Sequence, residues 1–215
     1  MASDTTRRLI LLRHAKSDWP DVPDRDRPLA KRGRRDAPRI GRWLHEHGYQ
    51  PDVVVVSDAA RTRQTWDLVA PELGGSPAVR FEPRAYAASA LSLLYLVQEL
   101  PDRYRSALLI GHNPGLSDLA TSLAAPPEPD RAPASPENDR APETDCAPGL
   151  PENDRAPEPD RATAPPESAR APDNGPRPAV SLPTAAVAVF EFPGDWPSLT
   201  PGHASLINLT TPADL

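Results

Sequence analysis

The sequence predicts an α/β protein built on a layered, mostly parallel sheet. Three short apolar runs, Leu9–Leu12, Val53–Val56 and Ala107–Ile110, have the length and composition of buried parallel strands. After each run comes a segment in which apolar residues recur at helical spacing. Strands that alternate with helices favour parallel neighbours, because a helix carries the chain back across the sheet between them.

Local signals define the elements of the first half. Ile40, Trp43 and Leu44 share one face at helical spacing, and Gly48 suits the C-terminal end of that helix. The four consecutive valines that follow favour a strand, and Gly74-Gly75 ends the next helix. The predicted order is a strand at 9–12, a loop at 18–28, a helix at 31–47, a strand at 53–56 and a helix at 59–73.

The second half continues the alternation of strands and helices. Ser89 suits the N-cap of a helix that runs to Leu100, because a serine hydroxyl accepts a backbone N–H of the first turn. Pro114 can open the first turn of the helix after it. The predicted order is a short strand at 79–81, a helix at 89–100, a strand at 107–110, a helix at 116–124, a strand at 185–192 and a last strand at 204–209.

Residues 126–178 differ in composition from the rest of the chain. They hold half of the 30 prolines, almost no bulky apolar side chain, and three similar copies of 15 residues between positions 127 and 171. Such a segment buries too little apolar surface to offset the entropy of ordering it, so we expect disorder. We predict one domain made of residues 1–125 and 179–215, interrupted by this disordered insert. A Pro-rich docking ligand is the alternative interpretation of the repeats.

Charge and composition exclude several classes of protein. The insert carries the whole net charge of −6, so the remainder is neutral and has no basic field for nucleic acid. No apolar run approaches a membrane span, and the N-terminus has no signal-peptide core. The single cysteine, Cys146, allows neither an internal disulfide nor a cysteine-based metal site. We expect a cytoplasmic monomer that binds no nucleic acid, membrane or metal.

Two histidines stand where predicted strands end. His14 comes directly after the first strand, with Arg13 before it, and His112 comes after the strand at 107–110. The carboxyl ends of parallel strands share one edge of the sheet, where ligands bind. A lone histidine at such an edge is more often structural, but a buried arginine beside it is costly without an anion. His14, His112, Arg13 and Arg61 therefore predict a site for a phosphoryl group.

Two arginines open the helix that follows the valine strand. Arg61 and Arg63 are two residues apart, so their side chains face different directions. One can reach the site and the other is solvated or paired, and we expect Arg61 to be the one that binds the phosphoryl group. The helix after His112 directs its N-terminal amide groups at the same anion.

Several motifs occur in a specific order along the chain. They are Arg13-His14-Ala15-Lys16-Ser17-Asp18-Trp19, Asp26-Arg27-Pro28-Leu29, Arg32-Gly33, Ser57-x-Ala59-x-Arg61-x-x-Gln64-Thr65, Gly111-His112-Asn113-Pro114-Gly115-Leu116 and Leu182-Pro183-Thr184-Ala185. Together they resemble the histidine phosphatase superfamily and, within it, the SixA-type phosphohistidine phosphatases. The first motif is similar to the Arg-His-Gly signature, with Ala15 in place of the glycine. The similarity covers nearly everything outside the insert.

The resemblance implies a three-layer α/β/α sandwich and a covalent phosphohistidine mechanism without metal or cofactor. Carried over by position, His14 is the nucleophile, Arg13 and Arg61 hold the phosphoryl oxygens, and His112 completes the pocket. A neutral imidazole attacks phosphorus in line while its other nitrogen donates to a backbone carbonyl. Arginine forks match phosphoryl oxygens bidentately, and water then hydrolyses phosphorylated His14.

The sequence departs from the superfamily pattern after the strand at 79–81. Many members carry an acidic residue there, whereas this chain has Ala87, with Glu82 as a candidate substitute. Without a positioned acid, a poor alkoxide leaving group is disfavoured, because that proton transfer is typically worth ~10²–10⁴-fold. A phosphoramidate depends less on this help. We also expect an open cleft, because the loop at 17–30 is short and no large lid follows.

These features favour dephosphorylation of phosphohistidine in a partner protein. The alternative among enzymes is a general phosphomonoesterase for a small phosphorylated substrate, since a mutase needs a lid that excludes water. A non-catalytic phospho-binding module and a scaffold built around the Pro-rich repeat are alternatives from other classes. Deleting residues 126–178 and measuring turnover separates the scaffold from the enzymes.

Overall fold

The computed structural model describes residues 6–124 and 179–215 and confirms the predicted α/β class. One sheet has the strand order β3-β2-β4-β1-β5-β6. Its strands are β1 (Thr6–Arg13), β2 (Val53–Ser57), β3 (Ala78–Glu82), β4 (Ser106–Gly111), β5 (Val187–Pro193) and β6 (Ser205–Thr210). The helices are α1 (Lys31–Glu46), α2 (Ala60–Leu73), α3 (Ala90–Gln98) and α4 (Gly115–Ala124), with 3-10 helices η1 (Asp24–Asp26), η2 (Pro83–Ala85) and η3 (Trp196–Ser198). The predicted insert, residues 126–178, lies outside the described residues.

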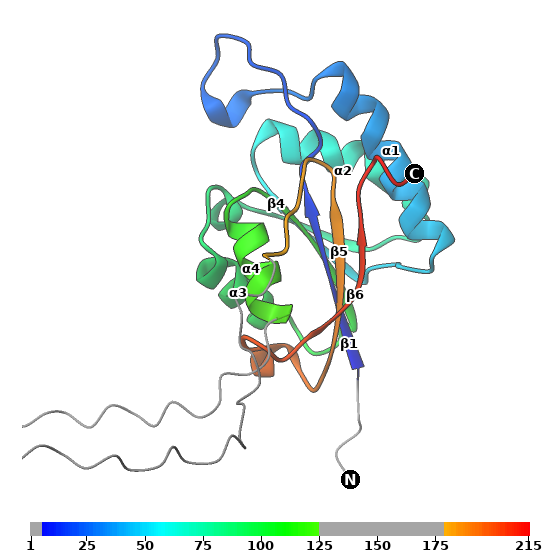
Figure 1. Ribbon diagram of the computed structural model, residues 1–215, viewed down its shortest axis with the longest axis vertical. Coiled ribbons are helices and arrows are strands. Elements are labelled where there is room, and N and C mark those ends of the chain that lie inside the picture. Colours follow the sequence, from blue (N-terminus) through cyan, green and yellow to red (C-terminus); the bar gives the residue numbers. More distant parts are fainter. Residues whose placement is uncertain (1–5, 125–178) are drawn as a thin grey trace, which may run out of the picture. The chain divides into compact units, whose positions relative to one another are not determined.

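The sheet is mostly parallel, as predicted. Strands β1 to β4 pair in parallel, and only β5 is reversed, antiparallel to its neighbours β1 and β6. Parallel pairing brings the carboxyl ends of β1, β2 and β4 to one edge. That edge is at the top of Figure 1, where the blue chain after β1 continues beyond the sheet.

Different helix pairs bury the two faces of the sheet. Along β1, Leu9 and Leu11 belong to the core formed with α3 and α4, whereas Ile10 and Leu12 belong to the core formed with α1 and α2. The valines of β2 alternate in the same way, because successive strand side chains point to opposite faces. Figure 1 shows α3 and α4 on one side of the sheet and α1 on the other. The fold is therefore the three-layer α/β/α sandwich that the resemblance implied. Among the described residues, no helix has the length and apolar character needed to cross a membrane.

Element boundaries differ from the predicted ones by a few residues, for local reasons. Strand β1 begins at Thr6 because its ladder with β5 continues past the apolar run, pairing Arg7 with Phe192. Strand β5 begins at Val187, two residues after the predicted start, because Ala185 has a positive φ of 60° and turns the chain. Ser89 caps α3 as predicted, with its hydroxyl accepting the Ser92 N–H at 3.2 Å.

The chain returns from the undescribed segment alongside α4. The Val180 N–H donates to Thr121 Oγ1 at 2.9 Å, near the C-terminal end of this helix. The Leu182 N–H donates to Ser117 Oγ at 3.1 Å, one turn closer to the helix N-terminus. Residues 179–184 therefore run back along α4 towards the carboxyl edge of the sheet. The C-terminal end of α4 is the end away from that edge. The chain leaves the described domain, and returns to it, at this end of the helix.

Replacing residues 126–178 with a short Gly/Ser linker is expected to shift the melting temperature by only a few degrees. The Thr121–Val180 hydrogen bond shows that the two junctions lie close together, so a short linker can close the gap. Loop-closure entropy changes by about 0.6 kcal/mol per doubling of loop length, so shortening the loop has a small effect. Thermal unfolding followed by circular dichroism measures this shift. Loss of a cooperative transition in the shortened protein would contradict the prediction.

Candidate active site

The four predicted site residues meet at the carboxyl edge of the sheet. His14 follows β1 and His112 follows β4, and the parallel register places Arg13 opposite Gly111. The two imidazole ring centroids lie 5.2 Å apart. Both rings are buried, with exposures of 8% for His14 and 6% for His112. Arg13 and Arg61 are close enough that their charges lower the pKa values of both histidines.

The His14 ring has a defined tautomer. Its Nδ1 lies 2.8 Å from the Ala15 carbonyl oxygen, and because a carbonyl can only accept, Nδ1 carries the hydrogen. Burial is the main cause that lowers the pKa of His14, to about 4, and the Arg61 and Arg13 charges add to it against the opposing effect of the Ala15 hydrogen bond. At neutral pH the ring is uncharged, and its Nε2 holds a free lone pair.

His112 is held from the other side by β2. Its Nε2 lies 2.8 Å from Ser57 Oγ, and its Nδ1 is buried without a hydrogen-bond partner among the described residues. Tyr86 packs edge-on against the ring, with centroids 5.5 Å apart. Burial, followed by the nearby His14 and Arg61, lowers the pKa of His112 to about 3. This ring is also neutral at pH 7.

The arginines divide as the sequence predicts. Arg61 is 6% exposed and directs its guanidinium towards Asp24, whereas Arg63 is exposed, donates to the Asp58 carbonyl and lies over the Phe81 ring. Arg13 donates from Nη1 to the Leu182 carbonyl at 2.9 Å, and its Nε is buried without a partner among the described residues. Unpartnered N–H groups on Arg13 and a neutral imidazole beside it suit an incoming oxyanion.

Asp24 is a site residue that sequence reasoning missed. Its carboxylate accepts hydrogen bonds from Arg61 Nη2 at 3.0 Å, from the Tyr86 hydroxyl at 2.7 Å and from Arg27 Nη1 at 2.8 Å. The Tyr86 and Arg27 hydrogen bonds, followed by Arg61, hold the pKa of Asp24 well below its usual range. Asp24 lies in the Asp- and Pro-rich loop after β1, where nothing in the local pattern separates it from its neighbours.

The loop at 17–30, for which the sequence predicts an open cleft, contacts the carboxyl edge of the sheet through charged residues. Through Asp24 the loop reaches over the Arg61 guanidinium, and Arg25 of the same turn pairs with Asp58 at the end of β2. Both histidines are buried beneath this arrangement. The loop is short, as predicted, and its charged residues Asp24 and Arg25 form ion pairs at the carboxyl edge of the sheet.

The motif at the start of α2 holds the chain that follows β1. Thr65 Oγ1 accepts the Ala15 N–H at 3.0 Å, next to the carbonyl that binds His14. Gln64 Oε1 accepts the Leu29 N–H at 2.8 Å at the end of the same loop. A Cβ at Gly33 would overlap the Lys16 carbonyl, so this position requires glycine for α1 to pack against the loop. These contacts explain why the resembling motifs extend beyond the charged residues.

Glu82 does not supply the missing acid. It ends β3 in a buried position, and its carboxylate is paired with both Arg80 and Arg84. The Arg84 hydrogen bonds are the main cause that lowers the pKa of Glu82 to about 2. Glu82 is therefore ionised at neutral pH and has no proton to donate. Ala87 stands where many members of the superfamily carry an acidic residue. Its backbone has a positive φ of 50°.

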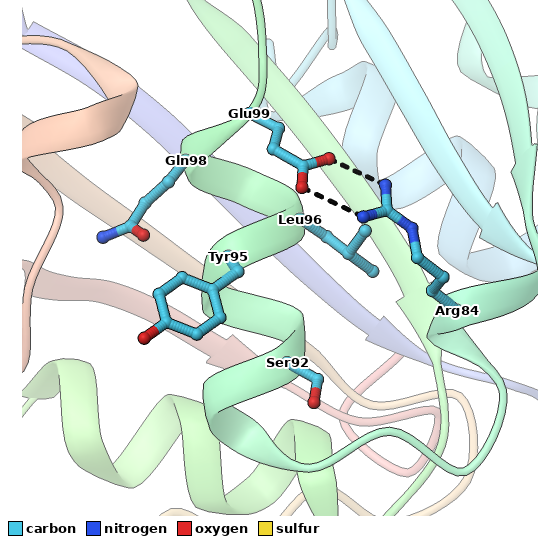
Figure 2. Close-up of a pocket in the computed structure, with 6 residues that line it drawn as sticks. All are labelled: Arg84, Ser92, Tyr95, Leu96, Gln98 and Glu99. Carbon is cyan, nitrogen blue, oxygen red and sulfur yellow. Dashed lines mark hydrogen bonds and ion pairs between the residues drawn. The ribbon is translucent and has the colours of Figure 1, made fainter.

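A surface hollow over α3 is separate from this cluster. Figure 2 shows Tyr95, Gln98 and Ser92 along the helix, with Arg84 facing Glu99. Arg84 and Glu99 form two hydrogen bonds of 3.0 and 2.7 Å, and Gln98 donates to the Leu199 carbonyl. Arg84 and Glu99 are therefore paired with each other and Gln98 with the backbone, and the hollow contains none of the predicted site residues. Within the described parts of the chain, no three His, Cys, Asp or Glu side chains gather as ligands for a metal ion.

Burial of two neutral imidazoles makes the stability of the fold depend on pH. Above pH 6.5, His14 and His112 are neutral in both the folded and the unfolded chain. In that range neither histidine makes the free energy of unfolding depend on pH. Below pH 6.5 the unfolded chain binds protons that the folded chain binds only near pH 4 and pH 3. The free energy of unfolding therefore falls as pH is lowered, by about 1.4 kcal/mol per pH unit for each histidine.

We expect His14→Asn to remove about half of this slope, since it removes one of the two groups. Urea unfolding at fixed pH values between 6.5 and 5 measures the slope. The lowered pKa of Glu82 acts only below pH 4.5, so it does not enter this window. His203→Asn, outside the site, is the control. An unchanged slope in His14→Asn would show that His14 is not buried in its neutral form.

Comparison with known proteins finds a matching family. Residues 9–85 match the sequence profile of the Histidine phosphatase superfamily (branch 1). An uncharacterized protein of Mycobacterium tuberculosis is 29% identical over 202 residues, which cover 94% of this chain and 99% of that protein. The structure of the protein assigned as phosphohistidine phosphatase SixA of Nakamurella multipartitia is similar, with a TM-score of 0.64 and 26% identity over 96% of each chain.

The protein histidine phosphatase SixA complexed with tungstate shares the fold, with a TM-score of 0.62 and 17% identity over 96% of this chain and 98% of that one. The matched profile spans the segments that carry Arg13, His14 and Arg61, and the full-length structural similarity adds the strand end that carries His112. Residues 9–85 therefore match the histidine phosphatase superfamily (branch 1), and the chain as a whole is similar to the SixA proteins.

Proposed function

We propose that this chain is a phosphatase that transfers a phosphoryl group to His14 and then to water, and that its substrate is a phosphohistidine of a partner protein. The arrangement of His14 supports the proposal. The ring is neutral, its Nδ1–H donates to Ala15, and its Nε2 lone pair is free. Arg13, Arg61 and His112 surround the ring with groups that suit a phosphoryl anion.

In the first half-reaction, Nε2 of His14 attacks the substrate phosphorus in line. A bond from Nε2 to phosphorus forms as the bond from phosphorus to the leaving nitrogen breaks, and the leaving nitrogen keeps that electron pair. The substrate ring reacts with a hydrogen on its other nitrogen, so it departs as neutral imidazole. The Ala15 carbonyl stabilises the charge that develops on the His14 ring, because it accepts the Nδ1 hydrogen. Arg13 Nε is buried without a partner among the described residues, in a position to bind an equatorial oxygen.

In the second half-reaction, water attacks the phosphorus of phosphorylated His14. The bond from phosphorus to Nε2 breaks, its electron pair returns to the ring, and inorganic phosphate leaves. His14 leaves as the neutral ring with its hydrogen on Nδ1, which is the form it has at neutral pH before the reaction. The same residue thus serves as nucleophile at neutral pH and as leaving group in the hydrolysis.

The carboxylates around the site favour a phosphoramidate over a phosphate ester. Asp24 is paired with Arg61, Asp58 with Arg25, and Glu82 with Arg80 and Arg84. Each of these carboxylates forms a salt bridge with a guanidinium, so none is placed to protonate an alkoxide leaving group. An imidazole leaving from phosphohistidine needs less of this help. Similarity to proteins assigned as SixA supports the same substrate class.

A leaving-group comparison tests the proposal. Turnover is measured on a protein that carries phosphohistidine, on p-nitrophenyl phosphate and on an alkyl phosphomonoester, with His14→Ala as the inactive control. We expect kcat/KM to fall in that order, because the demand for a general acid rises in that order. Equal efficiency on the alkyl ester would identify a general phosphomonoesterase. Binding of phosphohistidine without any turnover would identify a phospho-binding module.

A further inference from the structure

The most buried polar contact of the site belongs to Ser57, a motif residue without a role in the mechanism above. Ser57 is the last residue of β2 and is 0% exposed. Its Oγ lies 2.8 Å from His112 Nε2, the sole hydrogen bond of this hydroxyl among the described residues. Its carbonyl oxygen accepts the Thr62 hydroxyl at 2.7 Å, which ties the end of β2 to the first turn of α2.

The Ser57–His112 contact can carry its hydrogen in two ways. Either Ser57 donates to Nε2 and the ring hydrogen is on Nδ1, or Nε2 donates to Ser57 and Nδ1 has a lone pair. In the second arrangement the Ser57 hydroxyl hydrogen has no acceptor among the described residues. A fully buried hydroxyl that donates no hydrogen bond is costly, by about 1–3 kcal/mol. The first arrangement instead leaves the His112 Nδ1–H as a buried donor without an acceptor among the described residues, so the group that approaches Nδ1 decides between the two arrangements.

The surroundings of the other end of the His112 ring decide the assignment. Its Nδ1 is buried without a partner among the described residues, and Arg13 Nε is unpartnered in the same way. An oxyanion that enters beside Arg13 and Arg61 requires donors. An Nδ1–H supplies a hydrogen bond to it, whereas an Nδ1 lone pair repels it.

We propose that Ser57 is a positioning residue that donates its hydroxyl hydrogen to Nε2 of His112 and so holds this ring as the Nδ1–H tautomer, a neutral hydrogen-bond donor for a phosphoryl oxygen. The phosphoryl part of this inference rests on the proposed function. The choice of tautomer rests on it as well, since without an anion either arrangement leaves one buried donor, the Ser57 hydroxyl or the His112 Nδ1–H, without an acceptor among the described residues. Ser57 acts through His112 and has no contact of its own with the reacting atoms.

Nitrogen-15 NMR of histidine-labelled protein tests the assignment without any substitution. Two-bond nitrogen–hydrogen correlations distinguish a ring nitrogen that carries hydrogen from one that does not, and His112→Asn assigns the signals. We expect the wild-type His112 ring to show a hydrogen-bearing Nδ1 and a bare Nε2. The opposite pattern in the wild-type protein overturns the proposal, whatever the variants do.

Two serine variants then test the consequence for anion binding. Ser57→Ala removes the donor to Nε2, whereas Ser106→Ala removes another buried serine hydroxyl, at the start of β4, away from the site. Inorganic vanadate is the probe, titrated into each protein after thermal unfolding has shown that it is folded. We expect Ser57→Ala to lose the Nδ1–H tautomer and to bind vanadate about 10-fold or more weakly. Ser106→Ala should match the wild type in both measurements.

Retention of the wild-type tautomer and vanadate affinity by Ser57→Ala would overturn the proposal. If Ser57→Ala does not fold, Ser57→Cys takes its place, because a thiol keeps the approximate size but is a weak donor. Failure of the proposed function is recognised separately. His14→Ala would then keep its turnover while the His112 ring still shows Nδ1–H. A bare Nδ1 together with phosphorylated His14 would contradict the role of Ser57 alone.

Discussion

His14→Ala is expected to abolish turnover and the covalent intermediate together, with kcat reduced by about 10³-fold or more. The ring offers one bare nitrogen to the substrate, because its other nitrogen is engaged by the Ala15 carbonyl at 2.8 Å. Alanine removes that nitrogen and leaves Arg13 and Arg61 in place. The variant should therefore still bind phosphate, while no phosphoryl group is transferred to the enzyme.

The intermediate is measured by trapping. Wild-type protein mixed with a phosphorus-32 phosphodonor and quenched in base should retain label, and the label should disappear in acid, as expected of phosphohistidine. His45→Ala is the matched control, because its Nδ1 also lies near a backbone carbonyl, that of Leu73 at 3.0 Å, far along the chain from the site. Full turnover by His14→Ala would eliminate the covalent mechanism.

The two histidines and two arginines of the site could be predicted from sequence because strand ends are local features. The apolar runs end just before His14 and His112, and parallel pairing forces those ends to one edge of the sheet. The different directions of Arg61 and Arg63 are equally local, since residues two positions apart on a helix do not share a face. The unbroken apolar run at 9–12 likewise predicted a buried strand, although it did not indicate which helices cover its two faces.

The neighbours of these residues could not be predicted, because long-range contacts select them. Asp24 is 37 residues from Arg61 and 62 from Tyr86 along the chain, in a loop that contains other aspartates. The Leu182 acceptor of Arg13 is a backbone carbonyl, which has no residue-type signal. Glu82 had a suitable residue type and position, but its arginine partners make it a permanent anion. The ion pairs that the loop at 17–30 forms with Arg61 and Asp58 could not be predicted from its length either.

Arg61→Ala is expected to lower kcat/KM by about 10²-fold or more, whereas Arg63→Ala leaves it nearly unchanged. Arg61 is 6% exposed beside two neutral imidazoles, where a charge-assisted contact to a phosphoryl oxygen is poorly screened. Loss of one such contact costs about 2–4 kcal/mol of transition-state binding. Arg63 is solvated over the Phe81 ring and faces away from the site.

Two further variants test the planar shape of the Arg61 guanidinium and the contact that Asp24 makes with it. Arg61→Lys keeps the charge but not the planar fork, so it should recover only part of the lost kcat/KM. Asp24→Asn weakens the hold on Arg61 Nη2 while leaving Arg61 itself intact. If Asp24 holds Arg61 in a productive orientation, this variant should raise KM and lower kcat/KM on a free phosphodonor, though less than Arg61→Ala does.

The pair of alanine variants is informative because both remove an arginine from the first turns of α2, with the same change in net charge. A purely long-range effect of charge on an anionic substrate would lower kcat/KM for both by similar factors, and it would weaken as salt screens it. A direct contact to the phosphoryl group predicts a large, nearly salt-independent loss for Arg61→Ala alone. Steady-state kinetics at 0.05 and 0.5 M salt therefore decide between them, and comparable losses in both variants would show that Arg61 does not bind the phosphoryl group.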